Sequence, residues 1–147
     1  MPRPEDAVPL SRSELKKLAK ERLKDARILL DAGNYSGSYY LCGYAVECGL
    51  KAIIAKNIKG NLFPDKDFAA KCWTHKLDKL AELANLNIPL ENKLSADQDF
   101  AVSWSLTKDK WSERSRYKRY SKRDAKELYF AVSDNDHGVL SWLTNYW

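Results

Sequence analysis

The stretch YYLCGYAVECGLKAIIA, residues 39–55, decides the fold of this chain. Its apolar residues cover almost every side of a helix, which is typical of a helix buried at the centre of a domain. Glu47 and Lys51 lie near its middle and it is slightly too short for a charge-free membrane span, so we expect a buried core helix and no membrane partner. We predict this helix over residues 35–59, with Gly60 at its end.

Three glycines, Gly37, Gly43 and Gly49, lie six residues apart within this predicted helix. A glycine weakens a helix by about 1 kcal/mol relative to alanine. We therefore expect these positions to mark places where another part of the chain approaches the helix closely.

A capping box made by Ser11 and Glu14 predicts a first helix, which we expect to end at Gly33. The apolar residues that recur along it at helical spacing are Leu15, Ala19, Leu23, Ala26 and Leu30. Prolines are frequent before this helix, so residues 1–10 are predicted to be a flexible arm and residues 11–147 a single helical domain.

After the central helix, the pattern predicts a loop over residues 61–73 and then three more helices, with a connection that includes residues 87–89 after the first of them. Thr74 is the expected N-cap of a short helix, and capping boxes begin at Ser95 and Ser121. The expected core residues are Leu77, Leu80, Ala81, Ala84, Phe100, Trp104, Thr107, Trp111, Ala125, Leu128, Val132, Val139 and Leu143. The polar stretch 133–138 is expected to bend the last helix. The chain is thus predicted to be all-α, an antiparallel up-and-down bundle of about five helices.

The charge excess is concentrated in WSERSRYKRYSKR, residues 111–123, which we call the basic segment. The chain has 25 Lys and Arg against 20 Asp and Glu, and this segment supplies six of the cations and one of the acids. Cations interleaved with aromatic rings bind phosphates and offer faces on which bases stack. The simpler reading is a solvated basic turn between two helices. The predicted ligand-binding residues are Arg114, Arg116, Tyr117, Lys118, Arg119, Tyr120, Lys122 and Arg123.

Glu47 requires a compensating cation if it is buried in the central helix. Lys51 follows it by one turn, in the favourable order for an ion pair, and Arg114 or Arg116 are the donors that we expect from elsewhere in the chain. We assign Glu47 and Lys51 a structural role rather than a catalytic one.

The histidines and cysteines do not predict a metal or cofactor site. His75 is expected to order the loop before it, and His137 to reach solvent and titrate near neutrality. Cys42, Cys48 and Cys72 are odd in number and lack ligand spacing, which predicts reduced thiols. The N-terminus has no signal-peptide pattern, so we expect a cytoplasmic protein.

Several segments together resemble the HEPN family, a nucleotide-binding domain of higher eukaryotes and prokaryotes. They are residues 26–56, THKLDKLAELA at 74–84, WSERSRY at 111–117 and GVLSWL at 138–143. The most specific part is AVECGLKA, residues 45–52, and the pair Arg116–Tyr117 supports it.

The resemblance implies a helical bundle that pairs as a two-fold homodimer, often beside a separately encoded small nucleotidyltransferase. Many members are ribonucleases of toxin–antitoxin or defence systems, with an arginine followed after four to six residues by a histidine. No arginine of the basic segment has a histidine at that spacing, and Tyr120 and Tyr129 occupy such positions. A phenol with a pKa of about 10 is a poor general base at neutral pH. Arg116 and His137 are therefore only weak catalytic candidates.

We accordingly expect a dimeric HEPN-like protein that binds a nucleotide or RNA through the basic segment, without cleaving it and with a nucleotidyltransferase-type partner. One alternative is a metal-independent ribonuclease toxin. The other is a protein-docking module whose basic surface binds an acidic partner.

Overall fold

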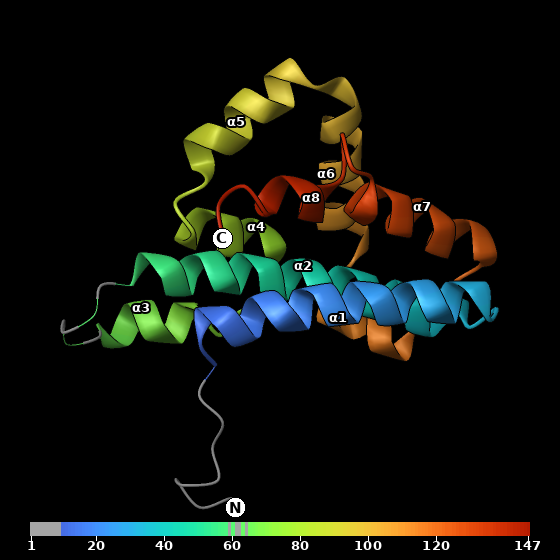
Figure 1. The fold of residues 1–147 in the computed structure, drawn as a ribbon, viewed down its shortest axis with the longest axis horizontal. Coiled ribbons are helices and arrows are strands. Elements are labelled where there is room, and N and C mark those ends of the chain that lie inside the picture. Colours follow the sequence, from blue (N-terminus) through green and yellow to red (C-terminus); the bar gives the residue numbers. More distant parts are fainter. Residues whose placement is uncertain (1–9, 59, 61–62, 64) are drawn as a thin grey trace, which may run out of the picture.

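The computed structural model describes residues 10–58, 60, 63 and 65–147. The predicted arm, residues 1–10, therefore lies outside the described residues except for Leu10. Within them the chain forms eight α-helices and one 3-10 helix and no strand (Figure 1). The all-α prediction is confirmed, but the expected number of about five helices was too low. In the same part of the chain, no helix is long and apolar enough to cross a membrane.

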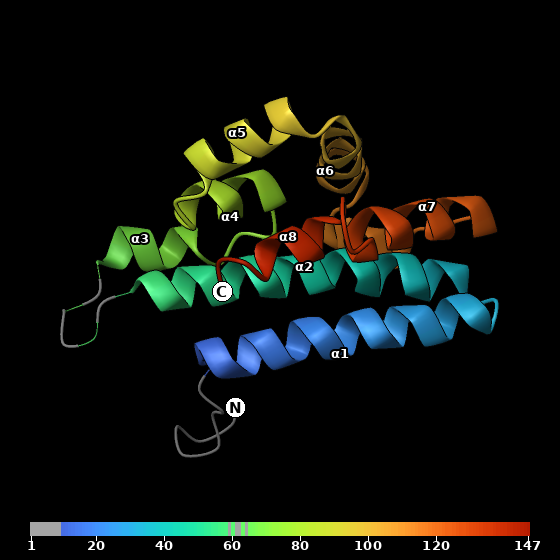
Figure 2. The same ribbon diagram turned by 45° about the horizontal axis from the view of Figure 1, so that its top comes forward.

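Helices α1, Arg12–Asp31, and α2, Tyr35–Asn57, form an antiparallel hairpin whose arms lie side by side (Figures 1 and 2). Ser11 caps α1 by accepting a hydrogen bond from the Glu14 amide at 3.1 Å. Gly33 forms the turn with φ of +83°, a conformation that glycine adopts without steric cost. The predicted start and end of the first helix are thus confirmed.

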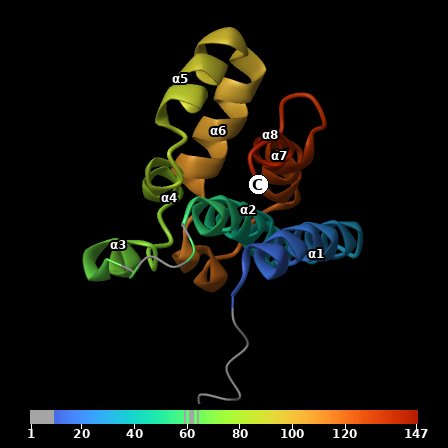
Figure 3. The same cartoon turned by 60° about the vertical axis from the view of Figure 1, so that its left-hand side comes forward.

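The second helix is the central element, as its composition predicted. Thirteen of its residues are buried, including Glu47, and Figure 3 shows α1, α3, α4 and α7 arranged around it. At Gly43 an added Cβ would overlap the Trp111 indole, and at Gly49 it would lie 2.9 Å from Leu140 Cδ1. These two glycines therefore mark close approaches, as expected.

Two of the predicted loops contain helices. Helix α3, Lys66–Lys71, lies within the expected loop 61–73 and is capped by Asp65, which accepts a hydrogen bond from the Asp67 amide. Helix α5, Asn87–Ala96, begins where we expected a connection, because Pro89 falls in its first turn, where a missing N–H costs nothing.

The helices on either side of α5 bury the stripes that the sequence predicted. They are α4, Leu77–Leu83, and α6, Gln98–Lys110. The predicted cap at Ser95 was wrong, because Ser95 lies inside α5 and α6 is capped by Asp97, whose carboxylate accepts from the Phe100 amide at 3.0 Å.

The predicted last helix is two helices, α7, Lys122–Ser133, and α8, Val139–Leu143. The capping box at Ser121 is confirmed. The chain breaks in the polar stretch, where the Gly138 amide donates to the Asp134 carbonyl at 2.9 Å and closes a turn. An added Cβ at Gly138 would overlap the Asp134 backbone, so this tight turn needs a glycine.

One core joins the elements. The largest fully buried apolar side chains come from five helices: Leu50 of α2, Leu80 of α4, Phe100 of α6, Leu128 of α7 and Leu143 of α8. Helix α6 is steeply inclined to α2 in Figures 1 and 2. The basic segment begins at the end of α6, where Trp111 contacts α2.

Candidate nucleic-acid interface

The basic segment is anchored on α2 by Trp111, the residue that ends α6. Trp111 is buried, and its Nε1–H donates to the Tyr40 carbonyl at 3.0 Å. The chain then forms the short 3-10 helix η2, Glu113–Tyr117, which opens with a capping box between Ser112 and Ser115. The first half of the segment is therefore held in a defined conformation.

Tyr120 is a second anchor. Its ring stacks on Tyr39 with centroids 3.6 Å apart and an interplanar angle of 9°. Its hydroxyl donates to Ser115 Oγ, and its amide donates to Ser36 Oγ, both at 2.9 Å. The sequence placed Tyr120 among the ligand-binding residues, whereas the structure gives it a supporting position with one ring face occupied. Tyr117 is instead the exposed ring, with 77% of its surface accessible.

The cations between and after these anchors point to solvent. The exposed ones are Arg114, Arg116, Lys118, Arg119, Lys122 and Arg123. Arg123 donates to Glu127 at 2.9 Å, whereas the other five have no carboxylate within 4 Å among the described residues. The Arg116 guanidinium lies 4.9 Å from the centroid of the Tyr117 ring. Tyr117 and, to a smaller extent, Tyr40 raise the pKa of Arg116.

Glu47 is buried, with 3% of its surface accessible, and its partners correct part of the prediction. Its Oε2 lies 3.3 Å from Lys51 Nζ, as one of the expected pairs, but its Oε1 lies 2.8 Å from His75 Nδ1. The expected clamp with Arg114 or Arg116 was wrong. Trp111 holds η2 against Tyr40, seven residues or about 10 Å along α2 from Glu47.

His75 connects the chain before α4 to the central helix through this contact, which agrees with its predicted ordering role. Glu47 was not predicted as its partner. Two features of the sequence could have suggested this contact: a histidine shortly before a helix, and one carboxylate in an otherwise apolar helix.

His137 lies in the turn between α7 and α8 and contacts the start of α6. Its Nδ1 is 2.7 Å from Asp97 Oδ2 and its Nε2 is 3.8 Å from Asp99 Oδ2. The hydrogen bond with Asp97 raises the pKa of His137. The Phe100 amide and then His137 hold the pKa of Asp97 well below its usual range.

These three side chains are close enough to ligate a metal ion together, with their ligand atoms within 4.8 Å. Each imidazole nitrogen faces a carboxylate, however, and Lys93 Nζ lies 3.1 Å from the same Asp97 oxygen. This is the arrangement of an ion-paired imidazole. His137 is also separated from the basic segment by the length of α6, about 20 Å for thirteen residues. Arg116 and His137 therefore do not form one site within a protomer.

The fold and this surface define an all-helical protein with a rigidly supported basic segment of the kind that suits polyanions. A family model for the HEPN domain matches residues 13–134, and the chain belongs to the HEPN domain family. The resemblance seen in the sequence is thus confirmed, and it assigns a nucleotide- or RNA-related function at the level of the family. Neither a curated protein nor a solved structure matches the chain.

Proposed function

We propose that this HEPN-domain protein binds single-stranded RNA or a nucleotide through the basic segment and does not cleave it. The observation that carries the proposal is a set of exposed cations in the same segment as the exposed Tyr117 ring, five of which have no carboxylate within 4 Å in the described part of the chain. Phosphates would contact the cations, and a base would stack on Tyr117.

The support of the segment favours binding, because the backbone between the anchors is already ordered. Trp111, Ser115 and Tyr120 are tied to α2 or to one another by hydrogen bonds. A pre-organised surface loses less conformational entropy when a ligand binds.

The absence of cleavage follows from the missing general base. No histidine occupies the family's spacing after an arginine of the segment, and His137 is held by Asp97 at the far end of α6. A ribonuclease that uses Arg116 with His137 would require the two residues to come from different protomers of a dimer.

The proposal includes two partners. A two-fold homodimer would double the cationic surface. The second partner, which the family implies, is a nucleotidyltransferase-type protein. We place this protein in the cytoplasm. The competing possibility is a docking module in which the five cations bind an acidic protein surface and no nucleic acid.

Binding is tested by fluorescence anisotropy of a labelled single-stranded RNA at several salt concentrations. If about four cations contact phosphates, log K should fall against log salt with a slope of about −3, or about −0.7 per contact. The double variant Arg119→Glu/Lys122→Glu should bind weakly and flatten the slope. Lys24→Glu/Lys79→Glu makes the same change of charge on other exposed helix positions and should bind like the wild type.

The same RNA, incubated with the protein and separated on a gel, tests cleavage. We expect it to remain intact. Cleavage that disappears in Arg116→Ala/His137→Ala would establish the ribonuclease instead. A protein that neither binds nor cleaves RNA would favour the docking module.

A further inference from the structure

Four residues on one side of the central helix are partly accessible to solvent. Tyr40, Tyr44, Lys51 and Ala55 are half-buried, whereas most of the helix between them is fully buried. At about 100° per residue these four positions lie within an arc of about 60°. They therefore lie on the same side of α2 as two pairs, separated by the buried residues 45–50, and we call these four positions the open face.

The open face begins beside the basic segment. The Tyr40 ring lies 6.2 Å from that of Trp111 and 6.1 Å from that of Tyr44, in both cases close to parallel. Tyr40 also contributes to the raised pKa of Arg116. The row of aromatic rings therefore continues directly from the proposed phosphate-binding cations.

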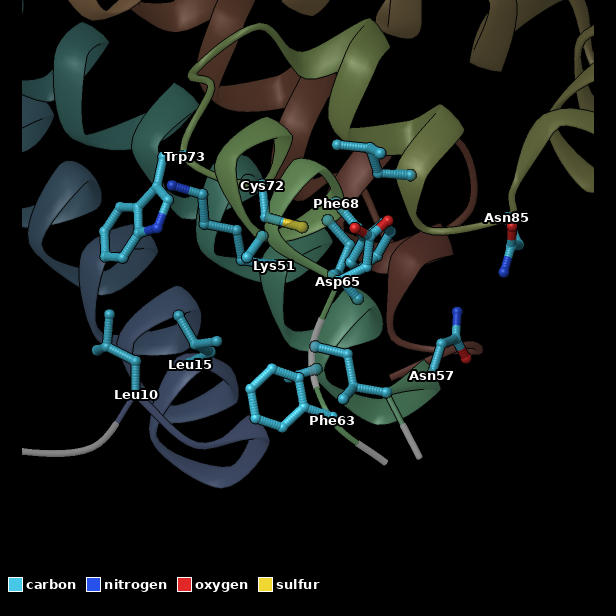
Figure 4. A pocket seen from close by; sticks show the side chains of 15 residues that line it. Leu10, Leu15, Lys51, Asn57, Phe63, Asp65, Phe68, Cys72, Trp73 and Asn85 are labelled. Carbon is cyan, nitrogen blue, oxygen red and sulfur yellow. The ribbon is translucent and has the colours of Figure 1, made fainter. Parts of the chain in front are cut away.

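The open face ends at an exposed indole. Trp73 precedes α4 and has 69% of its surface accessible, and Lys51 Nζ lies 5.9 Å from its ring. Beside them is a cavity of about 580 Å³ with a largely apolar lining that includes Leu15 and Ile54. Figure 4 shows Trp73 next to Lys51, with Leu15 below them.

The charge of Lys51 is compensated at this end by Glu47, which also bonds to His75. In Figures 1 and 3, η2 and α3 lie on the same side of α2, at different points along it. The two ends of the open face thus differ, with several exposed cations at η2 and a paired lysine beside an exposed indole at Trp73.

We propose that a single-stranded nucleic acid held by the basic segment continues along the open face to Trp73, where a base stacks. The inference rests on the proposed function and specifies its ligand as a strand rather than a mononucleotide. From Tyr40 to Lys51 the helix rises by about 16 Å, which corresponds to about five stacked nucleotides at about 3.4 Å each. Because Lys51 is paired with Glu47, the open face contributes mainly through stacking and adds little to the salt dependence of binding.

The experiment compares oligoadenylates of roughly four and roughly eight nucleotides, lengths set by the stacked rise of about 3.4 Å. The longer strand should bind more tightly with an unchanged salt slope, and it should quench the emission of Trp73, the most exposed indole. Trp73→Ala should weaken the longer strand about five-fold or more and leave the shorter one unaffected. Trp73→Phe should retain the affinity and lose the quenching.

Trp147→Phe is the matched control, because it removes a half-buried indole that lies beside Lys16 and Lys20 of α1 instead. This variant should preserve both signals. Equal affinity for the two lengths, or tight binding of the longer strand by Trp73→Ala, would overturn the proposed path while the shorter strand still bound with its salt slope. Absence of binding by both strands would overturn the proposed function as well.

Discussion

At the scale of single residues, the Glu47 carboxylate is buried but its two partners are not. The side chains of Lys51 and His75 remain in part accessible, so removal of the carboxylate leaves two polar groups that water can still reach. We expect Glu47→Ala to lower the free energy of unfolding by about 1–3 kcal/mol, less than for a fully buried pair. Glu47→Gln, which keeps the shape, should lose less.

Thermal melts of the two variants measure this effect. Glu82→Ala is the control, because the Glu82–Lys79 pair is exposed and should contribute less than about 1 kcal/mol. An unchanged melting temperature in Glu47→Ala would contradict the structural role of the carboxylate.

His137 makes the stability of the protein depend on pH. Asp97 raises the pKa of His137 above its ordinary value of about 6.5, so this contribution is complete below that pH and is lost as the pH rises through the folded-state pKa. The lowered pKa of Asp97 gives a contribution that is complete above about pH 3.9 and is lost only in stronger acid. His137→Gln keeps a neutral donor but no charge, and should lower the melting temperature more at about pH 5.5 than at about pH 8.5.

Other groups near the imidazole are Asp99, Asp134 and, through Asp97, Lys93. Asp136→Asn, in the same turn, should show no such difference between the two pH values. Equal losses of stability at both pH values in His137→Gln would show that the imidazole is not charged in the folded protein.

The burial of Glu47 and its pairing with Lys51 could be predicted, because both follow from helical spacing within an apolar helix. The contact with His75 could not, since it joins residues 28 positions apart and depends on the path of the chain before α4. The pairing of Glu47 with Arg114 or Arg116 was predicted wrongly for the same reason. The packing of Trp111, which is distant from Glu47 in the sequence, decides where these arginines lie.

At the scale of elements, the contact between α2 and Trp111 can be tested with glycine substitutions. Gly43→Ala would drive a methyl group into the Trp111 indole and should destabilise the fold by about 1–3 kcal/mol while displacing the basic segment. Gly37→Ala, whose Cβ would lie 3.3 Å from the flexible end of Leu29, should be neutral or gain up to about 1 kcal/mol from helix propensity.

Chemical denaturation of both variants, followed by RNA binding, separates the two effects. Gly43→Ala should weaken binding even where it remains folded. Normal binding and stability in this variant would show that the close packing of Trp111 is not required.

Long helices with strong periodicity were predictable as elements, and α1, α2 and the buried stripe of α6 followed their patterns. The short helices were not. Helix α3 has no buried residue to mark a stripe, and α5 likewise has none, so no apolar period distinguishes either one from a loop. The cap at Asp97 was missed because Ser95, two residues earlier, is followed after three residues by Gln98 and so has the sequence of a capping box.

At the scale of the whole molecule, an apolar patch between α6 and α7 is the surface that we expect to pair in the dimer. Val102 and Phe130 are exposed by 63% and 54%, and they line a groove with Leu106 and Ala131. Stable interfaces bury about 1,200–2,000 Å² in total, and in a two-fold dimer each contact occurs twice. We predict that Phe130→Glu is monomeric.

Light scattering coupled to size exclusion measures this directly, with the wild type expected at twice the chain mass. Ile88→Glu, on the exposed side of α5, should remain dimeric. A monomeric wild type would contradict the dimer, and a dimeric Phe130→Glu would contradict this choice of surface.

The net charge and its location in the basic segment were evident from the sequence, and the family followed from local motifs. It was not evident from the sequence that the His137 cluster and the basic segment are two separate polar regions. His137 and its carboxylates lie at one end of α6 and the basic segment follows the other end, which only the three-dimensional path of the chain reveals.

The order of residues within the basic segment has a consequence for how its specificity can diverge. Side chains that hold the segment in place, Trp111, Ser115 and Tyr120, are interspersed with side chains that are exposed to solvent. Mutations at the exposed positions should therefore alter the proposed ligand contacts while the fold tolerates them. A library randomised at Arg114, Tyr117 and Arg119 would sample new specificities with little loss of folded protein.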